Sequence, residues 1–263
     1  MKAIFNKMYL DGSFIDTDKE LSEEKSATYD VMRIIGGKPL FLDAHIDRVN
    51  RSLAKMGYDK VVDLPNVLFD LIKVNGDETV SCNVKILAGG DYRLAMGFVE
   101  SVYPNQSDYQ DGVRLTAARI ERSNPEVKVW HDDYKERIKE LVAEKQVFEV
   151  LLINGEDLVT EGSKSNIFFI KDKTVLTPET NVLPGITRRY AELAIENAGF
   201  ELSKSRISQA DLENMDAAFL TGTSLHILPI CCIDSFKYDS KNQVLRACMQ
   251  AFSQVVNKDL SIY

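Results

Sequence analysis

Strand-like and helix-like segments are mixed along the whole chain, and this order limits the folds open to it. Amphipathic segments predict helices at residues 43–56, 66–74, 132–145 and 187–198. Apolar or alternating runs predict strands at residues 8–15, 27–35, 79–88, 94–102, 113–120, 127–130, 148–153, 167–170, 174–176, 217–221 and 227–230. Because the two kinds of segment do not alternate strictly, we predict an α+β fold rather than a doubly wound parallel sheet.

The length of 263 residues allows one large domain or two modest ones, and 44% apolar residues supply enough material for a core. Residues 121–125 break the strand pattern, which places the expected boundary near residue 120. We therefore predict a small N-terminal domain over residues 1–120 and a larger one over residues 121–263. Within the first domain, Asp11-Gly12 predicts a hairpin turn and Asp43 an N-cap.

Charge and cysteine usage exclude several classes of partner. A net charge of −8 argues against nucleic acid and anionic membrane surfaces, which attract basic proteins. No targeting segment and no apolar run of about 18 residues is seen, so no membrane span is expected. The four cysteines have no zinc spacing, which favours a reduced, cytoplasmic protein without a structural metal.

Residues 160–189 contain two features that point to one ligand. Glu161 is a single carboxylate followed by small polar residues, and Gly185-Ile186-Thr187 opens a helix. A helix N-terminus with free N–H groups is an anion site. A ligand with a phosphate at one end and a basic nitrogen at the other would satisfy both features.

Two basic residues are candidates for the same ligand. Arg48 lies at the border of the predicted buried stripe of its helix, formed by Ile46, Val49, Leu53 and Met56, whereas Arg51 points away. Arg48 could therefore reach an interior phosphate, although a surface arginine paired with a carboxylate is the commoner case.

Lys128 shares a strand face with Trp130, and a lysine held in a pocket can lose its proton and form a Schiff base. A solvated strand lysine is the alternative. Dinucleotide, nucleoside-triphosphate and nucleophile-elbow motifs are absent from the sequence, and the three histidines have no metal-ligand spacing.

Taken together, "HIDRVNRS", "TEGSKSN", "LPGITRR" and "FLTGTSLHILP", with Glu161 following Lys128 by 33 positions, resemble the class IV aminotransferases. The resemblance covers residues 29–229. It implies fold type IV, pyridoxal 5'-phosphate as cofactor, two α/β domains and a homodimer whose active sites are shared between subunits.

The resemblance also implies roles for individual residues. Lys128 matches the lysine that binds the cofactor covalently and moves the substrate proton, and Glu161 matches the carboxylate on the pyridine nitrogen. The phosphate cradle is matched by Arg48, Ile186, Thr187, Gly222 and Thr223. Tyr29 matches a tyrosine near the substrate, and Arg93 is a further substrate-side candidate.

The sequence departs from the family pattern mainly at positions expected to contact the substrate. The Arg-x-His pair of D-amino-acid aminotransferases is missing around residues 89–94, and His226 replaces a common glutamate. Asp132 and Asp133 follow the lysine closely, where they could stabilise its charge or cap the next helix, and we favour capping.

We predict transfer of an amino group between an amino acid and a 2-keto acid, of the branched-chain or D-amino-acid type. The alternatives are an aminodeoxychorismate lyase that releases pyruvate and a non-catalytic protein that binds pyridoxal phosphate.

Overall fold

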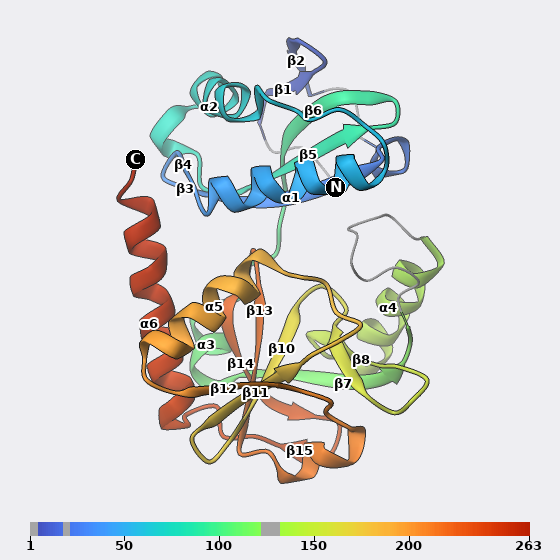
Figure 1. Ribbon diagram of the computed structural model, residues 1–263, viewed down its shortest axis with the longest axis vertical. Helices are drawn as coiled ribbons and strands as arrows, with labels where there is room; N and C mark the ends of the chain where they lie inside the picture. The colour runs from blue at the N-terminus through green and yellow to red at the C-terminus, as the bar shows by residue number, and fades with distance from the viewer. Residues whose placement is uncertain (1–4, 18–21, 122–131) are drawn as a thin grey trace. The chain divides into compact units, whose positions relative to one another are not determined.

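The computed structural model describes residues 5–17, 22–121 and 132–263, which form two compact units (Figure 1). The first unit holds the described residues up to Val102 together with Lys258–Tyr263, and the second holds those from Tyr103 to Asn257. Lys128 and the strand expected at residues 127–130 lie outside the described residues. The boundary expected near residue 120 stays a proposal, and the pairing of residues 113–119 with strands of the second unit favours a position nearer Val102.

The first unit is built on a six-stranded antiparallel sheet with the order β2-β1-β6-β5-β3-β4. Its strands are β1 (Lys7–Leu10), β2 (Ser13–Asp16), β3 (Thr28–Ile35), β4 (Lys38–Pro39), β5 (Asn83–Gly89) and β6 (Tyr92–Val99). The predicted hairpin between β1 and β2 is confirmed. Its turn residues Asp11 and Gly12 both have positive φ, as a tight hairpin turn requires.

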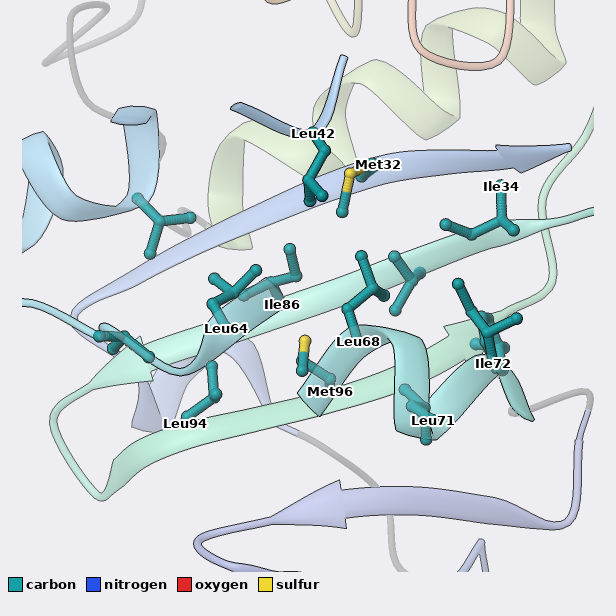
Figure 2. Packing of buried hydrophobic residues seen from close by; sticks show 14 of the residues in the cluster. Met32, Ile34, Leu42, Leu64, Leu68, Leu71, Ile72, Ile86, Leu94 and Met96 are labelled. Carbon is teal, nitrogen blue, oxygen red and sulfur yellow. The ribbon is translucent and has the colours of Figure 1, made fainter. Parts of the chain in front are cut away.

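Helices α1 (Leu42–Lys55) and α2 (Leu64–Val74) cover one face of this sheet, and short 3-10 turns occupy Glu23–Lys25 and Asp77–Thr79. Figure 2 shows the apolar layer between α2 and the strands, with Leu68 facing Ile86 of β5 and Met96 of β6. These side chains are buried because strand alternation turns every second residue of β5 toward the helices. Burial of this layer holds the unit together.

Helix α1 does not begin as the sequence suggested. Asp43 was expected to be its N-cap, but it lies in the first turn, and Phe41 occupies the cap position with a φ of 57°. The Phe41 N–H donates instead to Oδ2 of Asp259, at 2.7 Å, within the same unit. The N-cap prediction was wrong because this long-range partner cannot be seen in the local sequence.

The second unit contains a nine-stranded mixed sheet with the order β12-β11-β10-β13-β14-β7-β8-β9, and β15 pairs with β14. Parallel pairs join β11 to β12 and β7 to both β8 and β14, while the other pairs are antiparallel. The strands are β7 (Val113–Arg119), β8 (Glu149–Ile153), β9 (Val159–Gly162), β10 (Asn166–Lys171), β11 (Thr174–Pro178), β12 (Glu201–Ser205), β13 (Ala217–Gly222), β14 (His226–Ile233) and β15 (Phe236–Lys237). Because β7 pairs only within this sheet, residues 113–119 belong with the second unit.

Helices α3 (Gln106–Asp111), α4 (Asp132–Lys145), α5 (Ile186–Asn197) and α6 (Gln243–Leu260), with a 3-10 segment at Gln209–Asn214, accompany this sheet. Helix α4 packs on β8 through the residues predicted to face inward, Tyr134, Ile138, Leu141 and Val142. Helix α5 packs against β12 and β13. The mixed order of strands and helices confirms the predicted α+β class.

Several elements, among them α3, β12 and β15, have no counterpart in the sequence-based prediction. Strand β9 is only four residues long and carries a glutamate, and helix α6 lies in a C-terminal region for which no element was predicted. No helix among the described residues is both long and apolar enough to cross a bilayer.

Candidate functional site

Glu161 lies on β9 and is almost fully buried, with 2% of its surface exposed. Its Oε2 atom accepts a hydrogen bond from the backbone N–H of Leu183 at 2.9 Å and a longer one from Nδ2 of Asn166 at 3.4 Å. A buried carboxylate needs such donors, since loss of water is costly to a charged group. The sequence singled out Glu161, and the structure places it in an interior, hydrogen-bonded position.

Asn166 connects Glu161 to the segment that leads into helix α5. Besides reaching Glu161, its Nδ2 atom donates to the carbonyl oxygen of Leu183 at 2.9 Å. Its Oδ1 atom lies so close to Gly185 that a Cβ at that position would overlap it. Gly185 is therefore required here for close approach, and Asn166 and Leu183 together fix residues 183–185 against Glu161.

Helix α5 begins immediately after this segment, with Gly185 at the N-cap position and no side chain capping the first turn. Ile186 and Thr187 form the first turn, both are buried, and no acidic residue accompanies them. The N–H groups at such an end carry a partial positive charge and bind anions. The helix N-terminus predicted as a phosphate site is therefore available for a phosphate group.

A second part of the predicted cradle is the turn between β13 and β14. Gly222 pairs with His226, and the N–H of Leu225 donates to the Gly222 carbonyl at 3.0 Å, so the turn is tight and Thr223 is half-buried at its tip. Thr221 precedes the turn and pairs with Asn166 across the strands.

Thr221 also provides a test of whether a polar ligand fits at this edge of the sheet. Its Oγ1 atom is buried and has no hydrogen-bond partner among the residues that the structure describes. Buried hydroxyl groups are normally satisfied, so a polar group that no described residue supplies would complete this site. Together with the uncapped helix and the buried carboxylate, this donor set fits a ligand with a phosphate and a basic ring nitrogen.

Arg48 belongs to the first unit, where it is bound to a carboxylate. Its Nε and NH2 atoms both donate to Asp30, the first at 3.0 Å, and 11% of the side chain is exposed. The Nδ1 atom of His45 lies 3.2 Å from Oδ2 of the same aspartate. A forked pair of this kind holds the guanidinium in one orientation.

The predicted phase of α1 is confirmed in part. Arg48 lies at the border of the buried face and Arg51 is exposed, as expected. Met56, however, is 41% exposed and follows the last helical residue, so its place in the buried stripe was wrong. The pairing of Arg48 with a carboxylate, which the sequence left open as the alternative, is present.

The substrate-side candidates are also in the first unit. Tyr29 is half-buried on β3, and Arg93 is exposed near the start of β6. Lys128 lies outside the described residues. The structure thus brings together Glu161, Ile186, Thr187, Gly222 and Thr223 within one unit, and adds Asn166, whose role the sequence-based prediction missed.

Comparison with known proteins identifies the family. The family model for amino-transferase class IV matches residues 27–233. The chain belongs to the class IV aminotransferases. Enzymes of this family use pyridoxal 5'-phosphate, which is the cofactor that the donor set of the second unit fits.

Individual relatives span nearly the whole chain. The chain is 28% identical over 252 residues to a D-alanine aminotransferase from Bacillus licheniformis, covering 89% of both chains. It is 25% identical over 243 residues to an aminodeoxychorismate lyase from Bacillus subtilis, covering 84% of this chain and 82% of the lyase. A hypothetical aminotransferase from Mycobacterium tuberculosis, solved in its PLP-bound form, shares the fold, with a TM-score of 0.77, 15% identity and coverage of 96% of this chain and 99% of that one. These likenesses confirm the predicted fold and place the chain among aminotransferases and related lyases.

Proposed function

We propose that this chain is a pyridoxal-phosphate-dependent aminotransferase that transfers an amino group between an amino acid and a 2-keto acid, of the branched-chain or D-amino-acid type. The observation that carries the cofactor assignment is the link between buried Glu161 and the uncapped N-terminus of α5, made by Leu183 and Asn166. The likeness to a D-alanine aminotransferase over most of both chains supports the reaction type.

The proposed roles follow from the chemistry of each group. Glu161 would keep a proton on the ring nitrogen, because a nearby carboxylate favours the charged pyridinium. When bound, the protonated cofactor ring supplies an electron sink for the bond that breaks at the substrate Cα. The phosphate would be held by the N–H groups of Ile186 and Thr187, by Arg48 and by the turn at Gly222 and Thr223.

Lys128 is the residue proposed to hold the cofactor and to move the α-proton through its Nζ atom. A base of this kind works best when its pKa lies near the working pH. Acidic residues in the first turn of a helix interact favourably with its dipole, so we propose that Asp132 and Asp133 cap helix α4, which begins at Asp132. Tyr29 and Arg93 are proposed to lie on the substrate side.

A homodimer with shared active sites and a cytoplasmic location complete the proposal. The family resemblance supports the first, and the four cysteines, all of them free thiols, support the second. Sedimentation velocity of the active enzyme tests the dimer, and a monomer with full activity at low concentration would contradict it.

One experiment separates the aminotransferase from its two alternatives. The holoenzyme is mixed with single L- and D-amino acids without any keto acid, and the visible band of the bound cofactor and the keto acid released are measured. An aminotransferase should lose the band with at least one amino acid and release one equivalent of the matching keto acid.

The alternatives give other outcomes in the same assay. An aminodeoxychorismate lyase, which the Bacillus subtilis relative makes the second candidate, should leave the panel largely unchanged and release pyruvate from aminodeoxychorismate. A protein that only binds the cofactor should do neither. A visible band that no amino acid in the panel removes would reject the proposed reaction.

A further inference from the structure

Glu149 is a second buried carboxyl group close to the proposed cofactor site. It lies on β8, and its Oε1 atom accepts hydrogen bonds from the backbone N–H of Lys164 at 2.6 Å and from Oγ of Ser165 at 2.9 Å, with Oγ of Ser163 at 3.5 Å. All three donors belong to the turn at residues 163–165, which joins Glu161 to Asn166. The Glu149 carboxyl group therefore holds the segment that connects Glu161 to Asn166.

The same carboxyl group lies directly against the backbone of residue 162. A Cβ at Gly162 would come 2.6 Å from Oε1 of Glu149, and it would also overlap Oγ of Ser165. Gly162 in turn pairs with Leu151 of β8, two residues beyond Glu149. The chain after Glu161 is thus held from one side by strand pairing and from the other by the Glu149 side chain.

Glu161 lies close enough to Glu149 for its charge to affect the pKa of Glu149. Burial is the largest effect on Glu149, and it raises the pKa of this carboxyl group above its usual value. The Glu161 charge also raises this pKa. The hydrogen bonds from Lys164 and Ser165 and the charge of Lys164 lower this pKa, without cancelling the effect of burial. Two ionised carboxylates in one buried region repel each other, which is why the Glu161 charge raises the pKa of Glu149.

We propose that Glu149 is a positioning residue of the cofactor site, which holds the turn at residues 163–165 through its acceptor oxygen and thereby sets the position of Glu161. The proposal rests on the proposed function, since it needs Glu161 to contact the cofactor. Glu149 itself need not touch the ligand. Its effect passes through the backbone between Glu161 and Asn166.

The test compares Glu149→Ala with Glu149→Gln, measuring the pyridoxal-phosphate dissociation constant after dialysis and the Tm without cofactor. Glu149→Ala removes the acceptor for all three donors, so its dissociation constant should rise by about tenfold or more. Glu149→Gln keeps a neutral acceptor oxygen and should restore the constant to within about twofold of wild type, the difference expected from a small local change. Thr177→Val is the matched control, because Thr177 is a buried residue of the same sheet whose Oγ1 bonds only the Ile167 carbonyl among the described residues.

Two further variants keep every outcome interpretable. Ser165→Ala removes a single donor and should raise the dissociation constant less than Glu149→Ala does, and it serves if the latter fails to fold. Glu161→Gln tests the proposed function itself: an unchanged constant there would reject the role of Glu161. If Glu161→Gln weakens binding but Glu149→Ala and Ser165→Ala only lower the Tm, as the Thr177 control does, the positioning role is wrong and the proposed function stands. Weak binding by Glu149→Gln as well would show that an acceptor oxygen at this place does not hold the turn, and it would overturn the positioning role.

Discussion

The backbone N–H of Leu183 donates a 2.9 Å hydrogen bond to Oε2 of Glu161, and so joins two points 22 residues apart in the chain. Leu183 is followed after one residue by Gly185, the N-cap residue of α5. The carboxylate proposed for the ring nitrogen and the helix end proposed for the phosphate are thus parts of one hydrogen-bonded assembly.

Glu161→Gln should weaken pyridoxal-phosphate binding by about 1.5–3 kcal/mol, the scale of a hydrogen bond to a charged group. The amide keeps the shape of the side chain but cannot favour a protonated ring nitrogen. Equilibrium titration of cofactor into apoprotein measures the change. Glu156→Gln is the control, because Glu156 is exposed and pairs only with exposed Arg206 among the described residues, and an equal loss in both variants would contradict the role.

Gly185→Ala should lower the free energy of unfolding by roughly 1–3 kcal/mol, as overpacking does, because its Cβ would overlap Oδ1 of Asn166. The φ of Gly185, −64°, suits alanine, so the loss would come from the contact and not from backbone strain. Urea unfolding of the variant gives the value. Gly155→Ala provides the comparison, since a Cβ there meets nothing within 4 Å, and similar losses at both positions would contradict the close approach.

Arg48→Ala should weaken cofactor binding by roughly 1.5–3 kcal/mol if its guanidinium donates to the phosphate, as charge-assisted hydrogen bonds do. It should also lower the Tm, since Asp30 would lose its bidentate partner while staying buried. Arg51→Ala, on the exposed face of α1, should change neither quantity appreciably. The affinity is measured at a temperature where the Arg48→Ala variant is folded. An unchanged affinity would show that Arg48 binds Asp30 and does not bind the phosphate.

Lys128 should be the residue that borohydride links to the cofactor. Reduction of the holoenzyme followed by peptide mass spectrometry locates the label, because a lysine amine that has condensed with the cofactor aldehyde is fixed by reduction. Lys128→Ala should abolish labelling while the protein still folds. A label on any other lysine would reject the assignment.

Cys82 and Cys248 should resist alkylation in the folded protein. Burial is the main cause that raises the pKa of Cys82 to about 11 and that of Cys248 to about 12, so near neutral pH almost no reactive thiolate forms. Unfolding returns both thiols to the ordinary range, and iodoacetamide should then modify them. Rapid modification of either thiol before unfolding, followed by mass spectrometry, would show that it is accessible.

Local patterns in the sequence predicted much of the fold. The hairpin at Asp11-Gly12, the inward face of α4 and the start of α5 each depend on residues close together in the chain, so their spacing carries the information. Strand β9 was missed because four residues with a glutamate become a strand only by pairing with β8. The start of α1 was misplaced because the N–H of its N-cap residue, Phe41, donates a hydrogen bond to Asp259 rather than to a neighbouring side chain.

Motif resemblance predicted the cofactor-side residues proposed for the second unit, but it could not predict the hydrogen bonds that connect them. Asn166 stood in a quoted motif without a role, and Glu149 carried no motif at all. Both act through contacts that depend on how β8, β9 and β10 are paired, which local periodicity does not encode. The pairing of Arg48 with Asp30 was left open for the same reason. The phase of the helix shows the direction in which the arginine side chain points, but it does not show which carboxylate the arginine binds.

The bonds from Asn166 and Leu183 to one another and to Glu161 have a consequence for the energetics of ligand capture. They form within the protein chain alone, so the spacing between the carboxylate and the first turn of α5 is set when the second unit folds. The entropy lost in ordering residues 183–185 is then a term in the folding equilibrium and is absent from the binding equilibrium. Such preorganisation makes this part of the molecule a rigid receptor, in which variants that loosen Asn166 should bind with a larger unfavourable entropy even where every direct contact to the ligand is kept.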